Sequence, residues 1–163
     1  MNPLDLRIGI GHDTHRFVDG NGVRLGGVDI PYTRSLHGHS DADALLHAIT
    51  DALLGAASLG DIGELFPDTD AVNRNRDSAE MLTIVTDSVR CQGWEIVNVD
   101  CIVFAQAPKL SPYKQDIKKR IASILKIDAN QVGIKAKTGE NVGHIGRGEA
   151  IACEAAVLVY RRG

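Results

Sequence analysis

One aspartate and two histidines are spaced in a way that suits a metal ion. Asp13 and His15 follow a strand-like segment, and in an extended chain the side chains of residues i and i+2 point to the same side. His47 lies near the start of a long expected helix and can supply a third ligand from a second element. An aspartate and two histidines that leave one position open are typical of a catalytic rather than a structural zinc site.

The same three residues also have an ordinary interpretation, in which Asp13 caps a turn and both histidines are half-buried. For an isolated Asp-x-His pair this alternative is the more frequent one. The metal site is favoured by the crowding of polar side chains at the helix entry, which exceeds what capping requires. These side chains are His37, His39, Ser40, Asp41, Asp43, His47 and Asp51.

The expected start of the long helix also suits an anion. His39 and Ser40 stand where free backbone N–H groups and the helix dipole attract a phosphate. Ser40 is at the same time the expected N-cap, with Asp41 and Asp43 in the first turn. A cap does not exclude a neighbouring ligand, so both roles are retained.

Three loops carry further candidates, although each also has an ordinary interpretation as surface or turn residues. A polar segment that resembles a lid contains Asp61, Ile62, Gly63, Phe66, Pro67, Asp68, Thr69 and Asp70. Small residues that would let a flat ligand approach the backbone lie within Ala105, Gln106, Ala107, Pro108, Lys109, Leu110 and Ser111. Cations, a hydroxyl and a carboxylate, which suit a phosphate with a divalent cation, occur among Lys137, Thr138, Gly139, Glu140, His144 and Arg147.

The elements that must position these residues alternate between strands and helices. Strands are expected at 6–11, 94–105, 132–136 and 150–160, and a hairpin joins 23–25 to 28–30 across Gly26-Gly27. The long helix should run from its cap at Ser40 to Gly60. A second helix should begin near Asp77-Ser78 and end before Gly93, and a third should follow Ser111-Pro112.

This order of elements predicts an α+β fold, a two-layer α/β sandwich in which helices cover one face of a mixed sheet. The chain of 163 residues is expected to form one domain, 1–163. The last strand reads IACEAAVLVY, and aromatic residues make up only 4% of the chain. We therefore expect neighbouring subunits to cover the second face.

Composition excludes several classes of function. The 18 Lys and Arg residues are scattered among 21 Asp and Glu residues, so the chain has no basic surface that predicts binding to nucleic acid. No apolar stretch is long enough to predict a membrane span or a signal peptide, and a cytoplasmic protein is expected. Cys91, Cys101 and Cys153 lack a C-x-x-C spacing and are expected to be reduced, buried thiols.

Several segments, taken in order, resemble the cyclodiphosphate synthase family over nearly the whole chain. They read IGIGHDTHRF, LGG, HSDADALLHAITDALLGAASLGDIGELFPDTD, AQAPKL, KAKTGENVG and GRGEAIACEA. The long third segment is highly specific, whereas AQAPKL and the glycine-rich loop are weak signals by themselves. The resemblance implies an enzyme of non-mevalonate isoprenoid synthesis. Such an enzyme converts 4-diphosphocytidyl-2-C-methyl-D-erythritol 2-phosphate to a 2,4-cyclodiphosphate and releases CMP.

The resemblance also implies roles for individual residues. It implies zinc on Asp13, His15 and His47, with a second divalent cation, Mg²⁺ or Mn²⁺, on Glu140. His39 and Thr138 would stabilise the transition state. Residues 61–63 and 66–70, with Ser40, would bind the erythritol and phosphates, and residues 105–111 would hold cytosine. Asp13, Thr14, His15 and His39 would also contact the substrate. Family members are homotrimers with active sites between subunits.

Some positions depart from the family pattern. Lys137 and Gly139 stand where hydroxyl residues occur, and His144 replaces an aromatic residue of the central trimer cavity, where His12 is a further change. Lys137 can still contact phosphate, and Arg147 still suits a diphosphate. The apolar character of the cavity is what these changes call into question.

Two other functions compete with this interpretation. A zinc hydrolase would use the open metal position to form hydroxide, but the chain has no HExxH motif and no deaminase signature. A non-catalytic trimer would bind CDP without turnover. Release of CMP from the expected substrate distinguishes the three.

Overall fold

The computed structural model describes residues 5–67, 69–73 and 75–162, and a five-stranded mixed sheet runs through it. The strands lie in the order β4-β1-β7-β5-β6. Their bounds are β1 Leu6–Asp19, β4 Arg34–Leu36, β5 Trp94–Phe104, β6 Val132–Lys137 and β7 Ala150–Arg161. β7 is antiparallel to both β1 and β5, while β5 and β6 are parallel. A hairpin of β2 (Val23–Leu25) and β3 (Val28–Ile30) stands apart from this sheet.

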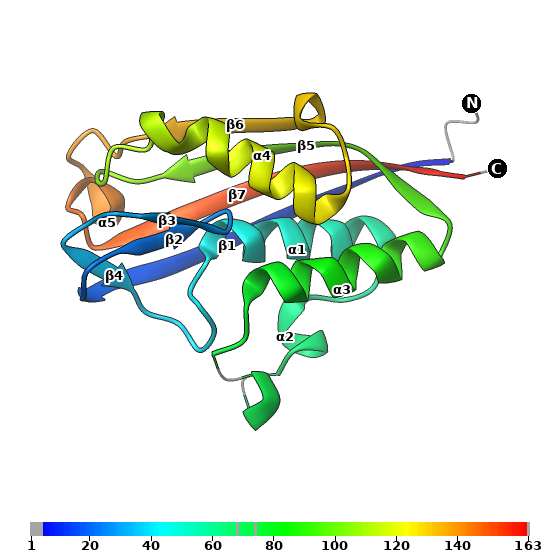
Figure 1. The fold of residues 1–163 in the computed structure, drawn as a ribbon, viewed down its shortest axis with the longest axis horizontal. Coiled ribbons are helices and arrows are strands. Elements are labelled where there is room, and N and C mark those ends of the chain that lie inside the picture. The colour runs from blue at the N-terminus through cyan, green and yellow to red at the C-terminus, as the bar shows by residue number, and fades with distance from the viewer. Residues whose placement is uncertain (1–4, 68, 74, 163) are drawn as a thin grey trace.

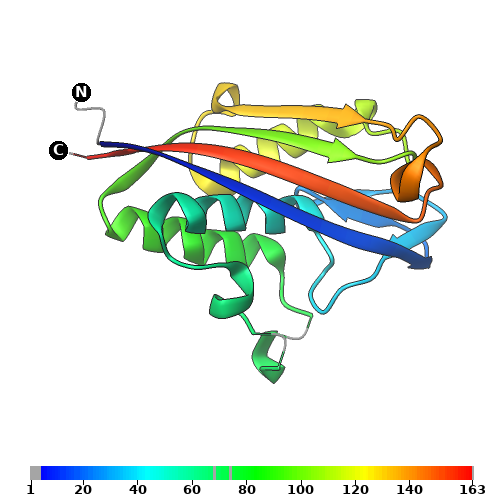
Figure 2. The ribbon, with the colours of Figure 1, turned by 180° about the vertical axis from the view of Figure 1, so that it is seen from behind.

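Three helices cover one face of the sheet, as Figure 1 shows: α1 (Ala44–Ala57), α3 (Ser78–Cys91) and α4 (Lys114–Leu125). Seen from behind in Figure 2, β1 and β7 pass in front of α1, and β5 and β6 pass in front of α4. Two short helices, α2 (Ile62–Leu65) and α5 (Gly143–Gly146), lie outside this layer. The predicted α+β architecture, a mixed sheet with helices on one face, is confirmed.

Alternating burial along the strands separates the two faces of the sheet. On β7, Cys153 and Val157 are buried toward the helices, whereas Glu154 between them is exposed. On β1 the alternate residues Ile8 and Ile10 are 67% and 73% exposed. Apolar side chains on an open sheet face are unusual in a monomer, so this face is a candidate surface for association.

The contact between β1 and α1 depends on two glycines. A Cβ atom on Gly9 would lie 1.8 Å from the carbonyl oxygen of Ala52, and one on Gly11 would lie 1.9 Å from that of Ala48. Both distances are far below van der Waals contact, and the opposing atoms belong to backbone that cannot rotate away. Glycine on the strand and alanine on the helix therefore allow the two backbones to touch.

The start of the long helix differs from the prediction. α1 begins at Ala44 with Asp43 as its N-cap, so Ser40 is not the cap and Asp43 is not in the first turn. A cap at Ser40 would require helical backbone at Ala42, but Ala42 has a φ of 58°, so the helix is capped three residues later, at Asp43. The helix ends at Ala57, and the left-handed Ser58 rather than Gly60 closes it.

Asp43 can replace Ser40 because its carboxylate satisfies more backbone donors. It accepts the N–H of Leu46 at 3.0 Å in the helix and those of Gly26 and Gly27 at 2.9 and 2.6 Å in the hairpin turn. Burial raises the pKa of Asp43, and these three hydrogen bonds oppose that rise. The one side chain therefore fixes both the helix start and the turn.

Most other predicted elements are confirmed within a few residues. The hairpin turns across Gly26 and Gly27, whose φ values of 61° and 73° suit a two-residue turn. β1 continues to Asp19, well beyond the predicted end at Gly11, because its pairing with β7 extends to Arg16. The third helix begins at Lys114, after a 3₁₀ turn over Ser111–Tyr113.

The cysteines are free, and Cys101 and Cys153 are buried as expected. Burial raises the pKa of the Cys101 thiol to about 12. Cys91 is exposed, which corrects the expectation that all three thiols are buried. Cys91 is the last residue of α3 and is not among the buried residues of that helix.

Replacing Gly11 on β1 and Gly55 on α1 by alanine should change the stability of the fold in opposite directions. Gly11→Ala forces its new methyl group into the α1 backbone and should destabilise the fold by about 3 kcal/mol or more. Gly55→Ala meets nothing within 4 Å on α1 and should stabilise it by about 0.5–1 kcal/mol. Thermal unfolding of both variants at equal protein concentration measures this. An unchanged midpoint for Gly11→Ala would contradict the close contact.

Candidate metal centre and its pocket

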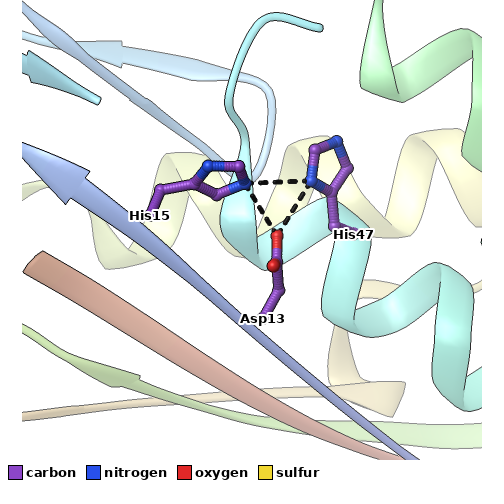
Figure 3. A group of neighbouring side chains, drawn as sticks. All are labelled: Asp13, His15 and His47. Atoms are coloured by element: carbon purple, nitrogen blue, oxygen red, sulfur yellow. Dashed lines mark hydrogen bonds and ion pairs between the residues drawn. The ribbon is translucent and has the colours of Figure 1, made fainter. Parts of the chain in front are cut away.

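Asp13, His15 and His47 meet at one point between the sheet and the helix layer. Asp13 and His15 point to the same side of β1, and His47 reaches them from the first turn of α1 (Figure 3). Asp13 Oδ2 lies 2.8 Å from His15 Nε2 and 2.9 Å from His47 Nδ1, and these two nitrogens are 3.3 Å apart. Within the described residues this is the one group of at least three such side chains found to converge.

The donor set fits a zinc ion. One carboxylate oxygen and two imidazole nitrogens converge within 4.8 Å, which brings each of them within reach of one ion. His15 Nδ1 lies 2.6 Å from the carbonyl oxygen of His37. A carbonyl oxygen can only accept a hydrogen bond, so Nδ1 carries the ring N–H. That hydrogen bond leaves the lone pair on Nε2, the nitrogen that faces Asp13.

The surroundings of Asp13 keep its carboxyl group ionised. Burial opposes ionisation, but hydrogen bonds and charge from His15 and His47 outweigh it and hold the pKa of Asp13 well below its usual range. Burial likewise opposes protonation of His15, yet Asp13 raises its pKa. The carboxylate is therefore available to a cation at neutral pH.

A pocket of about 550 Å³ opens beside the triad. Nine of the predicted site residues line it: Asp13, Thr14, His15, His39, Ser40, His47, Ile62, Gly63 and Phe66. Residues from β1, the helix entry and the α2 segment thus line one pocket. The Thr14 hydroxyl lies 3.0 Å from His12 Nε2, and both residues are exposed.

Seven further lining residues had no predicted role in the site, although His37 and Asp51 were counted among the polar side chains that crowd the helix entry: Arg16, His37, Gly38, Asp51, Asn73, Met81 and Ala150. Asp51 is the most informative of them. It lies four residues after His47 on α1, and residues at i and i+4 share a helix face, so this spacing could have identified it. Asp51 Oδ1 accepts the N–H of Ile62 at 2.8 Å, and burial raises the pKa of this carboxyl.

Asp61, Pro67, Thr69 and Asp70, the other described residues of the predicted lid, lie outside the pocket lining. Asp61 caps α2 by accepting the N–H of Glu64 at 2.9 Å. Pro67, Thr69 and Asp70 are exposed, and Asp68 lies outside the described residues. The structure therefore brings together only part of the predicted erythritol and phosphate segment.

The two other predicted loops lie together, but away from the triad. The N–H of Ala105 donates to the carbonyl oxygen of Lys137 at 2.9 Å, and Gln106 Nε2 donates to Asn141 Oδ1 at 3.1 Å. These bonds join residues 105–111, which follow β5, to residues 137–141, which follow β6. Among the candidates in both loops, Lys109, Thr138 and Glu140 are exposed, and Ala105 is buried.

Strand order separates these loops from the triad. Asp13 pairs with Cys153 on β7, and Cys153 pairs with Val103 on β5, beyond which β6 is the next strand. At a strand spacing of about 4.8 Å, three such steps place the end of β6 roughly 14 Å from the β1 ligands. None of residues 105–147 lines the pocket at the triad among the described residues.

Within the phosphate loop, backbone conformation gathers a hydroxyl and a carboxylate. Glu140 and Asn141 have φ values of 49° and 60°, which turn the chain sharply. The Thr138 hydroxyl donates to Glu140 Oε1 at 3.0 Å. His144 and Arg147 are exposed nearby in sequence, and Arg147 forms an ion pair with Glu149.

In the described part of the chain, no helix has the length and apolar character needed to cross a membrane.

Comparison with known proteins gives one consistent result. The model of the YgbB family matches residues 6–160. A 2-C-methyl-D-erythritol 2,4-cyclodiphosphate synthase from Treponema denticola is 48% identical over 157 residues, which cover 96% of this chain and 98% of that protein. A protein of the same name from Neisseria gonorrhoeae is 53% identical over 157 residues, with the same coverage of both.

Solved structures agree with this result. IspF from Plasmodium falciparum in a CDP complex is similar with a TM-score of 0.85 and 37% identity over 97% of each chain. The bifunctional IspDF from Campylobacter jejuni gives a TM-score of 0.93 and 44% identity, covering 96% of this chain and 42% of that one.

Asp51 should hold the α2 segment against the pocket. Asp51→Ala removes the acceptor of the Ile62 N–H, so exchange of that amide should accelerate roughly 2- to 10-fold. Asp87→Ala is the matched control: Asp87 is an exposed carboxylate on α3 that pairs with Lys126 at the end of α4, and its loss should leave exchange of the Ile62 amide unchanged. Hydrogen exchange by NMR measures both. Equal exchange in the two variants would show that Asp51 does not restrain α2.

Proposed function

Because the chain belongs to the YgbB family, we propose that its reaction takes place at the Asp13, His15 and His47 centre and proceeds by metal-assisted intramolecular phosphoryl transfer. The reaction itself is that of its relatives: the chain is a 2,4-cyclodiphosphate-forming lyase of the non-mevalonate isoprenoid pathway. It converts 4-diphosphocytidyl-2-C-methyl-D-erythritol 2-phosphate to 2-C-methyl-D-erythritol 2,4-cyclodiphosphate and releases CMP. The triad beside an open pocket is the observation that carries the metal-assisted mechanism.

The chemistry requires little from the protein beyond positioning. An oxygen of the 2-phosphate attacks the β-phosphorus and forms a new P–O bond, which closes the ring. The bond from the β-phosphorus to the oxygen bridging to the α-phosphate breaks, and CMP leaves with that oxygen. A phosphate monoester loses its second proton near a pKa of about 6, so the nucleophile is anionic at neutral pH without a dedicated protein base.

The metals supply charge and orientation. Zinc on the triad would orient the attacking phosphate, and Mg²⁺ or Mn²⁺ on Glu140 would offset charge on the α- and β-phosphates. His39 lines the pocket, and Thr138 shares the phosphate loop with Glu140. Both can donate hydrogen bonds to the transferring group, where charge develops.

The substrate would extend from the triad along the pocket. Ser40, Ile62, Gly63 and Phe66 line it and would contact the erythritol and its phosphates, with Asp61 and residues 67–70 beyond them. Residues 105–111 would hold cytosine. Within this segment Ala105 is small and buried and Lys109 is exposed, which suits a flat polar base. Lys137, Gly139, His144 and Arg147 complete the proposed phosphate loop.

We further propose that the active enzyme is a homotrimer in which each site is completed by a neighbouring subunit. Two observations support this. The open sheet face presents Ile8 and Ile10, and the cytosine and phosphate loops are separated from the triad of the same chain by two and three strand steps. An assembly that covers the open face can bring the loops of one subunit to the triad of another.

The central test of the metal site is His47→Ala. His47 is the one ligand that α1 contributes, so its loss leaves Asp13 and His15, which should hold zinc poorly. Helix α1 should remain folded because alanine favours helix more than histidine does. Zinc content and CMP release should both be lost, with unchanged circular dichroism. A folded variant that retains both would show that the metal triad is wrong.

Assembly can be tested on the open sheet face. Wild-type protein should show three times the chain mass in light scattering. Ile10→Glu places a charge on the 73% exposed face and should dissociate the trimer, whereas Ile84→Glu on α3 should not. The Ile10→Glu subunit should keep zinc, because its triad lies within one chain, and should lose CMP release. A stable wild-type monomer at micromolar concentration would overturn the shared site.

A further inference from the structure

Ser78, a buried residue outside the pocket lining, touches the metal centre from behind. It is the first residue of α3, and 1% of its surface is exposed. Its Oγ lies 2.8 Å from His47 Nε2, the ring nitrogen opposite to the Nδ1 that faces Asp13. The same hydroxyl bonds to Asp41 Oδ1. Ser78 thus connects a ligand histidine with a carboxylate on a different segment.

The surroundings of Asp41 determine where the hydroxyl proton lies. Asp41 forms an ion pair with Arg24, whose Nε is 3.2 Å from Oδ2. It also accepts the backbone N–H groups of Ser78 at 3.2 Å and Asp43 at 3.3 Å. A carboxylate surrounded by donors can only accept, so the one hydroxyl proton of Ser78 points to Asp41.

This arrangement fixes the tautomer of His47. With its proton directed to Asp41, Ser78 Oγ presents a lone pair to His47 Nε2, which must therefore carry the ring N–H. Nδ1 then has its lone pair free and lies 3.3 Å from His15 Nε2. This is the tautomer that a metal ligand at Nδ1 requires.

A second hydroxyl near His47 has a different position. Ser40 Oγ lies 3.1 Å from His47 Nε2, but Ser40 lines the pocket, whereas Ser78 does not. Because Ser78 Oγ accepts the hydrogen bond from the Nε2–H of His47, the Ser40 hydroxyl is free to turn toward a ligand in the pocket. Ser78 therefore orients the His47 ring, and Ser40 remains available to the ligand.

We propose that Ser78 and Asp41 are positioning residues for the metal centre, acting through a hydrogen-bond chain that runs from Asp41 through Ser78 to His47, with Arg24 ion-paired to Asp41. The inference rests on the proposed metal function of the triad. The chain orients the His47 ring, selects the Nε2–H tautomer and increases the metal affinity of Nδ1. Loss of such an outer hydrogen bond typically lowers metal affinity by about 10- to 100-fold.

Ser78→Ala tests the chain, with Thr83→Ala as the matched control. Thr83 is also on α3, and its hydroxyl donates to the carbonyl oxygen of Ala79 in the same helix. Zinc affinity, measured by competition with a chromophoric chelator, should fall about 10- to 100-fold in Ser78→Ala and stay unchanged in Thr83→Ala. Circular dichroism and thermal unfolding of the metal-free proteins should be alike. Equal zinc affinity in both variants would overturn the inference.

A measurement on the unmodified protein keeps the inference testable if Ser78→Ala fails to fold. In ¹¹³Cd-substituted protein with ¹⁵N-labelled histidine, the metal coupling of His47 should appear at Nδ1 and the ring proton at Nε2. Coupling at Nε2 would refute the chain. If the wild-type protein binds neither zinc nor cadmium, the proposed metal function fails. Wild-type binding with no effect of Ser78→Ala and intact folding refutes the positioning role alone.

Discussion

The backbone contact between β1 and α1 is the constraint on which the site depends. Gly9 faces Ala52 and Ala56, and Gly11 faces Ala48 and Ala52, with no room for a Cβ atom on the strand. The next residues on that face of β1 are Asp13 and His15, and the residue of α1 before Ala48 is His47. The close contact of the two backbones therefore ends where the small residues give way to Asp13, His15 and His47. The separation of the two backbones sets the distances from His47 Nδ1 to Asp13 Oδ2 and to His15 Nε2, which are 2.9 and 3.3 Å.

The position of α1 along the strand depends on its amino terminus. Asp43 caps the helix and binds the Gly26–Gly27 turn of the hairpin with the same carboxylate. Removing a buried, fully hydrogen-bonded carboxylate typically costs about 3 kcal/mol or more. The segment before Asp43 carries Ser40 and Asp41, which both belong to the hydrogen bonds around His47. A structural cap and the metal centre are therefore joined through a few residues.

Local patterns predicted the parts of the molecule that local forces determine. The i, i+2 spacing of Asp13 and His15, the helical position of His47 and the crowding of polar side chains at the helix entry together predicted the triad, because one strand and one helix create it. The cap was assigned to Ser40 instead of Asp43 because the competing hydrogen bonds come from Gly26 and Gly27, which are distant in sequence. Ser78 was outside the prediction for the same reason, since its role arises from the packing of α3 beside His47.

The separation of the two halves of the candidate site has a physical consequence for assembly. Residues 105–111 and 137–141 are tied by the Ala105–Lys137 and Gln106–Asn141 hydrogen bonds, and each loop follows one of two adjacent parallel strands. They can therefore be presented to another molecule as one preorganised surface, with little ordering entropy lost on association. In the assembly we propose, the cytidine and the diphosphate would meet this surface, while the attacking phosphate would meet the triad. Intramolecular attack requires both ends of the substrate to be held at once. Covering the apolar sheet face would thus supply both the stability of the assembly and the geometry of the reaction.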